Sequence, residues 1–279
     1  MKVILLIALI TSIISAKNAN LVITKSIDIL KKYPDVKRNL TTLKSLNLTL
    51  LGFKEGKYIW YMLLVTNPKK PKGAFWFLPH DNENSAFDSA IYAVRKYGGG
   101  FLSILSGGKR YHQGQDPNRN FSLSPTKEPS CNFQKSASYL YTSTIMHIIN
   151  NYKRPNMPYL ALHNNTNRGG ISILKDSTYT KSYLAYKRDQ VIKGKGLADE
   201  DNLVYIAGNS VNAPAKKVQK LLNAGLNTKY EYVTNNNNDC SMSNFIVLNY
   251  TDNYYNIEAQ HGKSKIQKAM IDRLMKIIE

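Results

Sequence analysis

Three side chains of this sequence have the types and the spacing of a metal site. His80 and Glu83 are three residues apart after an apolar run, and His163 closes a second apolar run. A strand end or tight turn can direct the first two at one ion, while the third arrives from a neighbouring strand. Zn²⁺ in hydrolytic enzymes takes three such ligands and leaves a fourth position for water. The triad therefore predicts an open, catalytic zinc site.

The apolar runs before the two histidines predict buried strands that position them. Residues 73–79 and 155–162 are rich in aromatic and aliphatic side chains. In open α/β sheets, ligands bind beyond the carboxyl ends of strands, which is where His80 and His163 lie. This context favours the metal interpretation over a chance His-x-x-Glu, which is a weak motif in a chain with 5 histidines.

A stiff turn at residues 116–119 supplies candidate substrate ligands. It contains Asn118 and Arg119, and the planar fork of an arginine matches a carboxylate. The alternative is that turn chemistry alone explains the segment and that Arg119 lies on the surface. Arg110 lies nine residues earlier, behind two glycines. Two arginines near a metal suit an anionic substrate and an oxyanion.

Glu258 is the candidate general base. It lies in residues 254–260, where Tyr255 and Ile257 alternate with polar residues as in a half-buried strand. A lone glutamate in a strand usually faces solvent. This one is the only acid of its strand, however, and a hydrolytic zinc site requires a general base.

Taken in order, these elements resemble the zinc carboxypeptidase superfamily, also called the M14 or funnelin family. The order is His-x-x-Glu, Asp-x-Asn-Arg-Asn-Phe, strand-His and strand-Glu, and it spans about residues 73–262. The Asn-Arg-Asn-Phe box is its most specific part. The resemblance implies that His80, Glu83 and His163 bind zinc. It also implies that Glu258 is the general base and proton shuttle.

The same resemblance implies roles in substrate binding. Asn118 and Arg119 would hold the terminal carboxylate of a substrate, and Arg110 would polarise the scissile carbonyl. Met242 and Ser243 lie about fifteen residues before the strand glutamate. Carboxypeptidases keep residues that line the pocket for the terminal side chain in this position.

The sequence departs from digestive carboxypeptidases around the site. Only 35 residues separate Glu83 from Asn118. This spacing is nearer to the succinylglutamate desuccinylase and aspartoacylase branch, or to bacterial cell-wall peptidases. The residues that follow His163 and Glu258 also differ from the digestive pattern, so we expect a different specificity.

The N-terminus has the pattern of a secretory signal. A lysine precedes an apolar run at 3–14, which is too short to span a membrane comfortably, and small residues follow. We expect cleavage of residues 1–16 and an exported bacterial protein, periplasmic or secreted, with no transmembrane anchor. Residues 17–72 would form an N-terminal segment with a strand hairpin, packed on a catalytic domain at 73–279.

Cys131 and Cys240 are the only cysteines of the chain. In an exported protein, two cysteines permit one disulfide, and the alternative is two separate buried thiols. Neither has metal-site spacing, and Cys131 has no adjacent base that would make it a nucleophile. We expect a disulfide that ties the segment after the Asn-Arg box to the pocket-lining loop.

A net charge of +19 raises the local concentration of anionic partners. The lysines are dispersed rather than clustered with aromatic residues, and no DNA- or RNA-binding motif is present, so we expect no nucleic-acid partner. An anionic polymer such as cell wall, or an anionic membrane surface, fits the charge better.

Predicted strands and helices alternate along the chain, which favours an α/β fold. We expect one domain with a mixed, mostly parallel central sheet flanked by helices, like that of zinc carboxypeptidases. Ser85 is the expected cap of the first helix after the metal motif. Besides the strands named above, the predicted strands are 48–53, 58–65, 202–207 and 245–250, and the predicted helices are 85–97, 136–152 and 265–278.

These features predict an exported zinc-dependent hydrolase that cleaves an amide next to a free carboxylate. Export and basic charge favour peptides or peptidoglycan stem peptides as substrates. One alternative is an N-acyl amino acid deacylase of the succinylglutamate desuccinylase and aspartoacylase type. Another is a metal-containing module that binds cell-wall peptides without cutting them.

Overall fold

The computed structural model describes most of the chain and includes every candidate site residue. The described residues are 22–24, 30–125, 131, 137–167, 171–175, 177–178, 181–188, 191–251 and 253–279. The predicted signal sequence at 1–16 lies outside them. Within these ranges, no helix combines the length and the apolar character that crossing a membrane requires.

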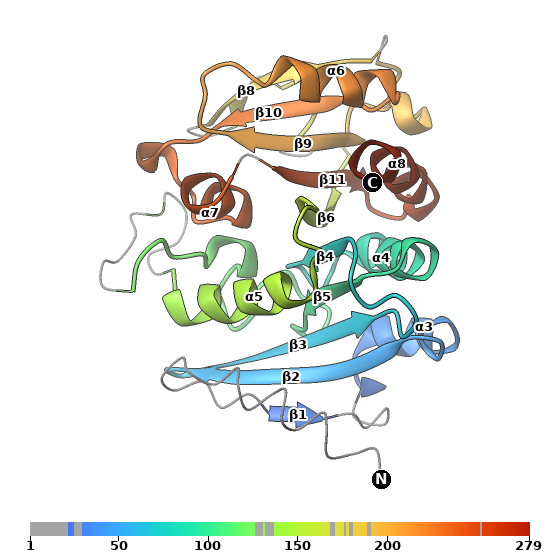
Figure 1. The fold of residues 1–279 in the computed structure, drawn as a ribbon, viewed down its shortest axis with the longest axis vertical. Helices are drawn as coiled ribbons and strands as arrows, with labels where there is room; N and C mark the ends of the chain where they lie inside the picture. Colours follow the sequence, from blue (N-terminus) through green and yellow to red (C-terminus); the bar gives the residue numbers. More distant parts are fainter. Residues whose placement is uncertain are drawn as a thin grey trace.

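One mixed β-sheet runs through the molecule (Figure 1). Its strands are β1 (Val22–Thr24), β2 (Asn47–Glu55), β3 (Tyr58–Thr66), β4 (Phe75–Leu78), β5 (Gly100–Ile104), β6 (Tyr159–Asn165), β7 (Ser177–Thr178), β8 (Lys181–Tyr186), β9 (Leu203–Gly208), β10 (Thr228–Tyr232) and β11 (Tyr254–Gln260). Across the part of the chain described, they lie in the order β1-β2-β3-β5-β4-β6-β11-β9-β10-β8-β7. The predicted α/β class with a mixed sheet is confirmed.

Parallel pairing is concentrated at the centre of this sheet. The neighbours β5, β4, β6 and β11 are parallel, and β9 with β10 is a further parallel pair. Pairing is antiparallel where β3 meets β5 and where β11 meets β9, and both ends of the sheet are antiparallel. The predicted excess of parallel strands thus holds for the centre, which carries the candidate site.

Helices cover both faces of the sheet. They are α3 (Pro34–Leu43), α4 (Asn84–Tyr97), α5 (Tyr139–Tyr152), α6 (Ala215–Asn223), α7 (Met242–Asn249) and α8 (Ser264–Ile278), with short 3₁₀ turns η1 (Pro117–Arg119), η2 (Gly196–Ala198) and η3 (Asn235–Asn237). Figure 1 shows α3, α4 and α8 on one side and α5 and α7 on the other. Two separate apolar cores fill the spaces between the sheet and these two groups of helices.

The hairpin of the N-terminal segment is part of the same sheet. Strands β2 and β3 pair along their whole length, and β3 continues into the centre by pairing with β5. Trp60 of β3 is fully buried in the core beneath α5, and its ring packs at a tilt against that of Tyr141. The described part of residues 17–72 therefore extends the sheet of a single domain.

The predicted strand at 245–250 is wrong, because this segment belongs to helix α7. The hydroxyl of Ser241 accepts from Asn244 N and caps the helix, and Phe245 and Ile246 are buried in the core below it. A short, uniformly apolar run has no period that separates a buried helix from a buried strand. Here the cap before the run, together with the core that receives it, favours the helix.

The expected cap at Ser85 is also wrong. Helix α4 begins at Asn84, Glu83 occupies the cap position, and Ser85 lies inside the first turn. Its hydroxyl accepts a hydrogen bond from Gly262 N at 2.8 Å. The glutamate therefore stands at the junction of strand and helix.

Candidate functional site

The predicted metal ligands His80, Glu83 and His163 converge in the structure. Glu83 Oε1 lies 2.8 Å from His80 Nδ1, and Glu83 Oε2 lies 3.2 Å from His163 Nδ1. One ligand atom from each of the three lies within 4.8 Å of the others. All three residues are buried, with exposed fractions of 3–5 %. The two imidazoles thus present the same type of nitrogen to one point.

Adjacent parallel strands bring these ligands together. Strand β4 ends at Leu78, and Glu83 N donates to the carbonyl of His80 in the tight turn before α4. Strand β6 lies beside β4 through the pairs Trp76–Leu160 and Phe77–Ala161. The carboxyl ends of parallel strands meet at one edge of the sheet, so the turn and the histidine of β6 become neighbours.

A carboxylate outside the triad holds the first histidine. His80 Nε2 lies 2.8 Å from Asp116 Oδ1, which leaves Nδ1 as the nitrogen that faces Glu83. Burial alone would raise the pKa of Asp116, but the histidine and two nearby arginines outweigh it and lower that pKa. Histidine ligands of metals are commonly oriented by such a carboxylate. This role of Asp116 was not predicted from the sequence.

The donor set fits a divalent ion of the zinc type. Two nitrogens and a carboxylate are the ligands of open zinc sites. Burial opposes ionisation of Glu83, yet the charges of His80 and His163 lower its pKa strongly. Its Oε2 also accepts from Asn164 N at 3.0 Å. The carboxylate is therefore kept ionised and fixed in orientation, as a metal ligand must be.

Glu258 lies on the strand next to His163. Strand β11 runs parallel to β6, and the register places these two residues opposite each other. Glu258 is buried, and burial followed by the negative charge of Glu83 raises its pKa. The carboxamide of Asn256 donates to its Oε1 at 2.9 Å. A carboxylate with a raised pKa beside the candidate metal ligands suits a general base.

Asn256 is a second residue to which sequence analysis gave no role. Alternate residues of a strand point to the same face, so a polar side chain two positions before Glu258 could have been singled out. Its hydrogen bond orients the carboxylate of the candidate base.

Arg110 lies beside the ligand cluster. Its Nη1 is 3.3 Å from both Glu83 Oε1 and His80 Nδ1, and its Nη2 is 3.4 Å from Asp116 Oδ2. The side chain is 40 % exposed, so it reaches in from the solvent side. The loop before it is anchored by buried Asp81, whose Oδ2 accepts from two backbone amides. The structure thus places a cation next to the predicted metal.

Asn118 and Arg119 form the 3₁₀ turn η1, capped by Asp116, whose side chain accepts from Asn118 N at 2.9 Å. Arg119 is not a surface cap, since its side chain is only 25 % exposed and its Nε lies 3.1 Å from Asp239 Oδ2. The carboxamide oxygen of Asn118 accepts from Met242 N at 3.3 Å. Asp116 therefore supports both His80, the first candidate metal ligand, and the arginine turn.

Met242 and Ser243 form the first turn of α7 beside this arginine turn. Met242 is fully buried, and the hydroxyl of Ser243 lies 2.9 Å from that of Ser241. The contact between Met242 and Asn118 places the start of α7 against the expected carboxylate site. Pocket lining by these residues stays a prediction.

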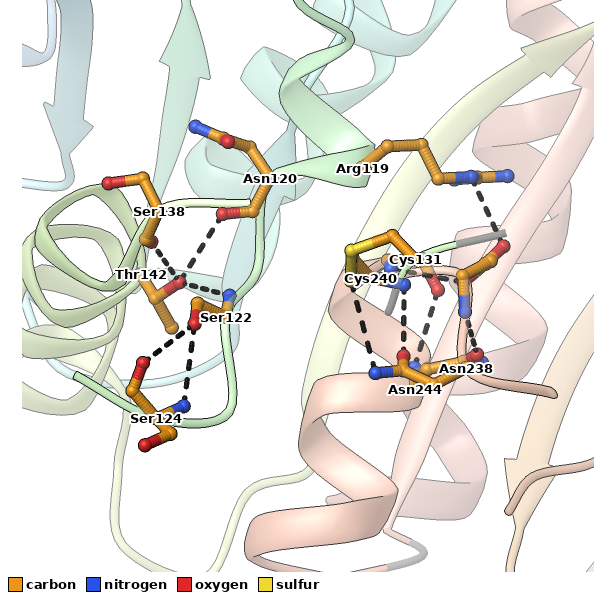
Figure 2. Close-up of a disulfide and its surroundings, with 12 residues drawn as sticks. Arg119, Asn120, Ser122, Ser124, Cys131, Ser138, Thr142, Asn238, Cys240 and Asn244 are labelled. Carbon is orange, nitrogen blue, oxygen red and sulfur yellow. Dashed lines mark hydrogen bonds and ion pairs between the residues drawn. A yellow bond between two sulfur atoms is a disulfide. The ribbon is translucent and has the colours of Figure 1, made fainter. Parts of the chain in front are cut away.

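A disulfide joins Cys131 to Cys240 next to this region, as Figure 2 shows. The two Cα atoms are 5.4 Å apart. Phe121 N donates to the carbonyl of Cys240 at 3.0 Å, so the bridge ties the segment after the Asn-Arg box to the loop before α7.

We expect no free thiols in unreduced, denatured protein, because both cysteines are bridged. Reduction should lower the free energy of unfolding by about 2–4 kcal/mol, since the cross-link restricts the unfolded chain. Thiol titration and denaturant unfolding with and without reductant measure both effects. Two titratable thiols before reduction would contradict the expectation.

Comparisons with known proteins find similarity only among solved structures. No protein-family model matches the chain, and neither does any curated protein. A candidate metallopeptidase from Shewanella amazonensis is 15 % identical with a TM-score of 0.49, over 92 % of this chain and 98 % of that one. A succinylglutamate desuccinylase/aspartoacylase from Rhodobacter sphaeroides is 11 % identical with a TM-score of 0.43, over 84 % and 65 % of the two chains.

Thrombin activatable fibrinolysis inhibitor is also 11 % identical, with a TM-score of 0.44 over 90 % of this chain and 71 % of that one. Likeness at this level does not extend to substrate or activity.

Proposed function

We propose that this chain is an exported zinc-dependent hydrolase of the carboxypeptidase type, which cleaves an amide bond next to a free carboxylate. The observation that carries the proposal is the convergence of His80, Glu83 and His163, with Glu258 opposite His163 on the next strand. An acid–base group beside a metal triad is the minimum set for metal-assisted hydrolysis.

In this proposal, His80, Glu83 and His163 hold the zinc, which when bound lowers the pKa of a water and polarises the scissile carbonyl. Glu258 accepts the proton that the attacking water loses and then delivers it to the leaving amine. Its raised pKa supports this shuttle, because it favours retention of the accepted proton until the leaving amine takes it. Asn256 holds one carboxylate oxygen in place through its hydrogen bond.

The two arginines bind different negative charges of the substrate. Arg110 lies against the triad and donates to the oxyanion that forms on the carbonyl oxygen when the carbonyl carbon is attacked. Arg119 and Asn118 bind the terminal carboxylate of the substrate. The planar guanidinium suits this task, because it can donate two parallel hydrogen bonds to one carboxylate. Met242 and Ser243 line the pocket for the terminal side chain.

Peptides, and peptidoglycan stem peptides in particular, are the proposed substrates, and no nucleic-acid partner is proposed. The secretory pattern of residues 1–16 supports a location outside the cytoplasm, periplasmic or secreted, and the charge of +19 supports an anionic surrounding polymer. The disulfide is of a kind that persists in oxidising compartments.

A second candidate function is deacylation of N-acyl amino acids. The short interval of 35 residues between Glu83 and Asn118 favours it over the digestive pattern. Incubating the zinc-loaded protein with peptides, muropeptides and N-acyl amino acids, followed by mass spectrometry, separates the two. Loss of a terminal residue, trimming of a stem and release of an acyl group give different mass changes, and no change in any of them contradicts both.

We expect one tightly bound zinc ion per chain, measured by metal analysis of the purified protein. His80→Ala or His163→Ala should empty the site, since each removes one of three ligands. His147→Ala is a matched control, because this histidine is exposed on α5 and its side chain hydrogen-bonds to Asn151, away from the three candidate ligands. Full zinc content in both ligand variants would refute the assignment.

A further inference from the structure

The loop before α7 is fastened to the Asn-Arg box at three points. Met242 N donates to Asn118 Oδ1 at 3.3 Å, Asp239 Oδ2 lies 3.1 Å from Arg119 Nε, and Phe121 N donates to Cys240 O at 3.0 Å. Residues 118–121 and 239–242 thus lie side by side although more than a hundred residues separate them in the sequence.

Asp239 is the charged member of this contact. It is fully buried, and its Oδ1 accepts from Ser241 N at 3.0 Å. Its backbone N donates to Asn244 Oδ1 at 3.0 Å, so the residue is held from both its main chain and its side chain. A buried carboxylate needs a cation partner, and here that partner is Arg119.

The pairing with Asp239 also affects the pKa of Arg119. Burial opposes the charged form of Arg119, but the charge of Asp239, followed by that of Asp116, keeps its pKa above the usual value. Nη1 also donates to the carbonyl of Asn118 at 3.0 Å. The guanidinium is planar, so contacts at Nε and Nη1 fix the orientation of the whole group.

The loop that carries Asp239 has an unusual backbone conformation at the disulfide. Cys240 has a φ of 57°, a conformation that residues other than glycine rarely adopt. Its N–H donates to Asn238 Oδ1 at 2.9 Å, and its sulfur is bonded to Cys131. Figure 2 shows the bridge, Asn238 and Asn244 gathered at this loop, with the side chain of Arg119 reaching toward it.

We propose that Asp239 is a positioning residue, which holds the guanidinium of Arg119 in the orientation that binds a substrate carboxylate, while the Cys131–Cys240 disulfide keeps Asp239 in place. The inference rests on the proposed function in one respect, since it takes Arg119 as the group that binds the carboxylate. Asp239 itself touches no substrate and acts through the arginine.

The test is Asp239→Asn, which keeps the size of the side chain but removes its charge. We expect KM for a free-acid peptide to rise by about tenfold or more with little change in kcat, because carboxylate binding is lost rather than chemistry. C-terminally amidated peptide should be unaffected. Asp88→Asn is the control, since it breaks an ion pair of 2.8 Å between Asp88 on α4 and Arg38 on α3.

A double-mutant cycle with Arg119→Ala separates positioning from general destabilisation. If Asp239 acts through the arginine, Asp239→Asn should cause no further rise in KM once Arg119 is alanine. An additive rise, or an equal loss on acid and amide substrates, would overturn the proposal. Zinc content and thermal unfolding of each variant verify folding, and Asp239→Glu, which keeps the charge, should show a KM between wild type and Asp239→Asn.

A direct measurement of peptide binding makes the test independent of turnover. In the Glu258→Gln background, calorimetry compares the Kd of a free-acid peptide with that of its amide. We expect Asp239→Asn to abolish the preference for the acid, and Cys131→Ala with Cys240→Ala to reduce it. A retained preference in Asp239→Asn overturns the positioning role even if the wild type is an active hydrolase. A preference lost without any wild-type hydrolysis supports the positioning role and refutes the proposed function.

Discussion

Replacing Glu258 with glutamine should lower turnover by at least the ~10²–10⁴-fold that general acid–base groups contribute. The amide has the size of the carboxylate and can stay opposite His163 on the neighbouring strand, but it cannot accept a proton. Zinc content and substrate affinity should barely change, because the loss falls on the transition state. Steady-state kinetics and metal analysis measure the two effects separately.

Asn256→Ala tests the same role of Glu258 with a smaller change. It removes the hydrogen bond to Glu258 Oε1 and leaves the carboxylate itself, so we expect a smaller fall in kcat. If the wild type hydrolyses and Glu258→Gln stays fully active, another group is the base. If the wild type never turns over and the substitution has no effect, the chain is a binding module rather than an enzyme.

Replacing Arg119 with alanine should weaken turnover of free-acid substrates by about 10²-fold, the scale expected when one partner of a hydrogen-bonded charge pair is lost. C-terminally amidated substrates should be poor for the wild type and little affected further. The ratio of kcat/KM on acid and amide forms of one peptide measures this selectivity. Equal wild-type rates on both forms would end the assignment of a terminal carboxylate site.

Two further variants make the result on Arg119 specific. Arg119→Lys keeps the charge but not the planar fork, and we expect an intermediate loss. Arg119→Ala also leaves Asp239 as a buried carboxylate without this partner, so its thermal unfolding must be compared with that of Arg119→Ala combined with Asp239→Asn. If the double variant recovers thermal stability but not the preference for acid over amide substrates, the arginine itself binds the carboxylate.

The disulfide and the convergence of His80, Glu83 and His163 could be predicted from sequence because few alternatives existed. With two cysteines in the chain, only one intramolecular pairing is available. His80 and Glu83 are local neighbours that any tight turn after a strand would bring together. His163 follows an apolar run of the same kind, and parallel strands end at a common edge.

Glu258 was identified from its type and its strand, but its place beside the triad depended on the register of β11 against β6. A shift of one residue would have turned its side chain to the other face of the sheet. The observed pairing of Glu258 with His163, and the burial that raises the pKa of the glutamate, come from the packing of the whole sheet.

The supporting acids required the tertiary structure. Asp116 lies 36 residues from His80, and Asp239 lies 120 residues from Arg119. Asp116 belongs to the Asp-x-Asn-Arg motif, but no local pattern marks either acid as the partner of a residue so distant in the sequence. Close approach of the chain segments made these pairs, and burial then made their charges dependent on each other.

The helix at Met242–Asn249 shows the same limit for secondary structure. Its apolar run would suit a buried strand equally well. The cap at Ser241 and the core beneath α7 favour the helix instead. Residue types and spacing along the chain determined which groups could do chemistry. The fold decided which of them are oriented and buried, because orientation and burial depend on contacts between segments distant in sequence.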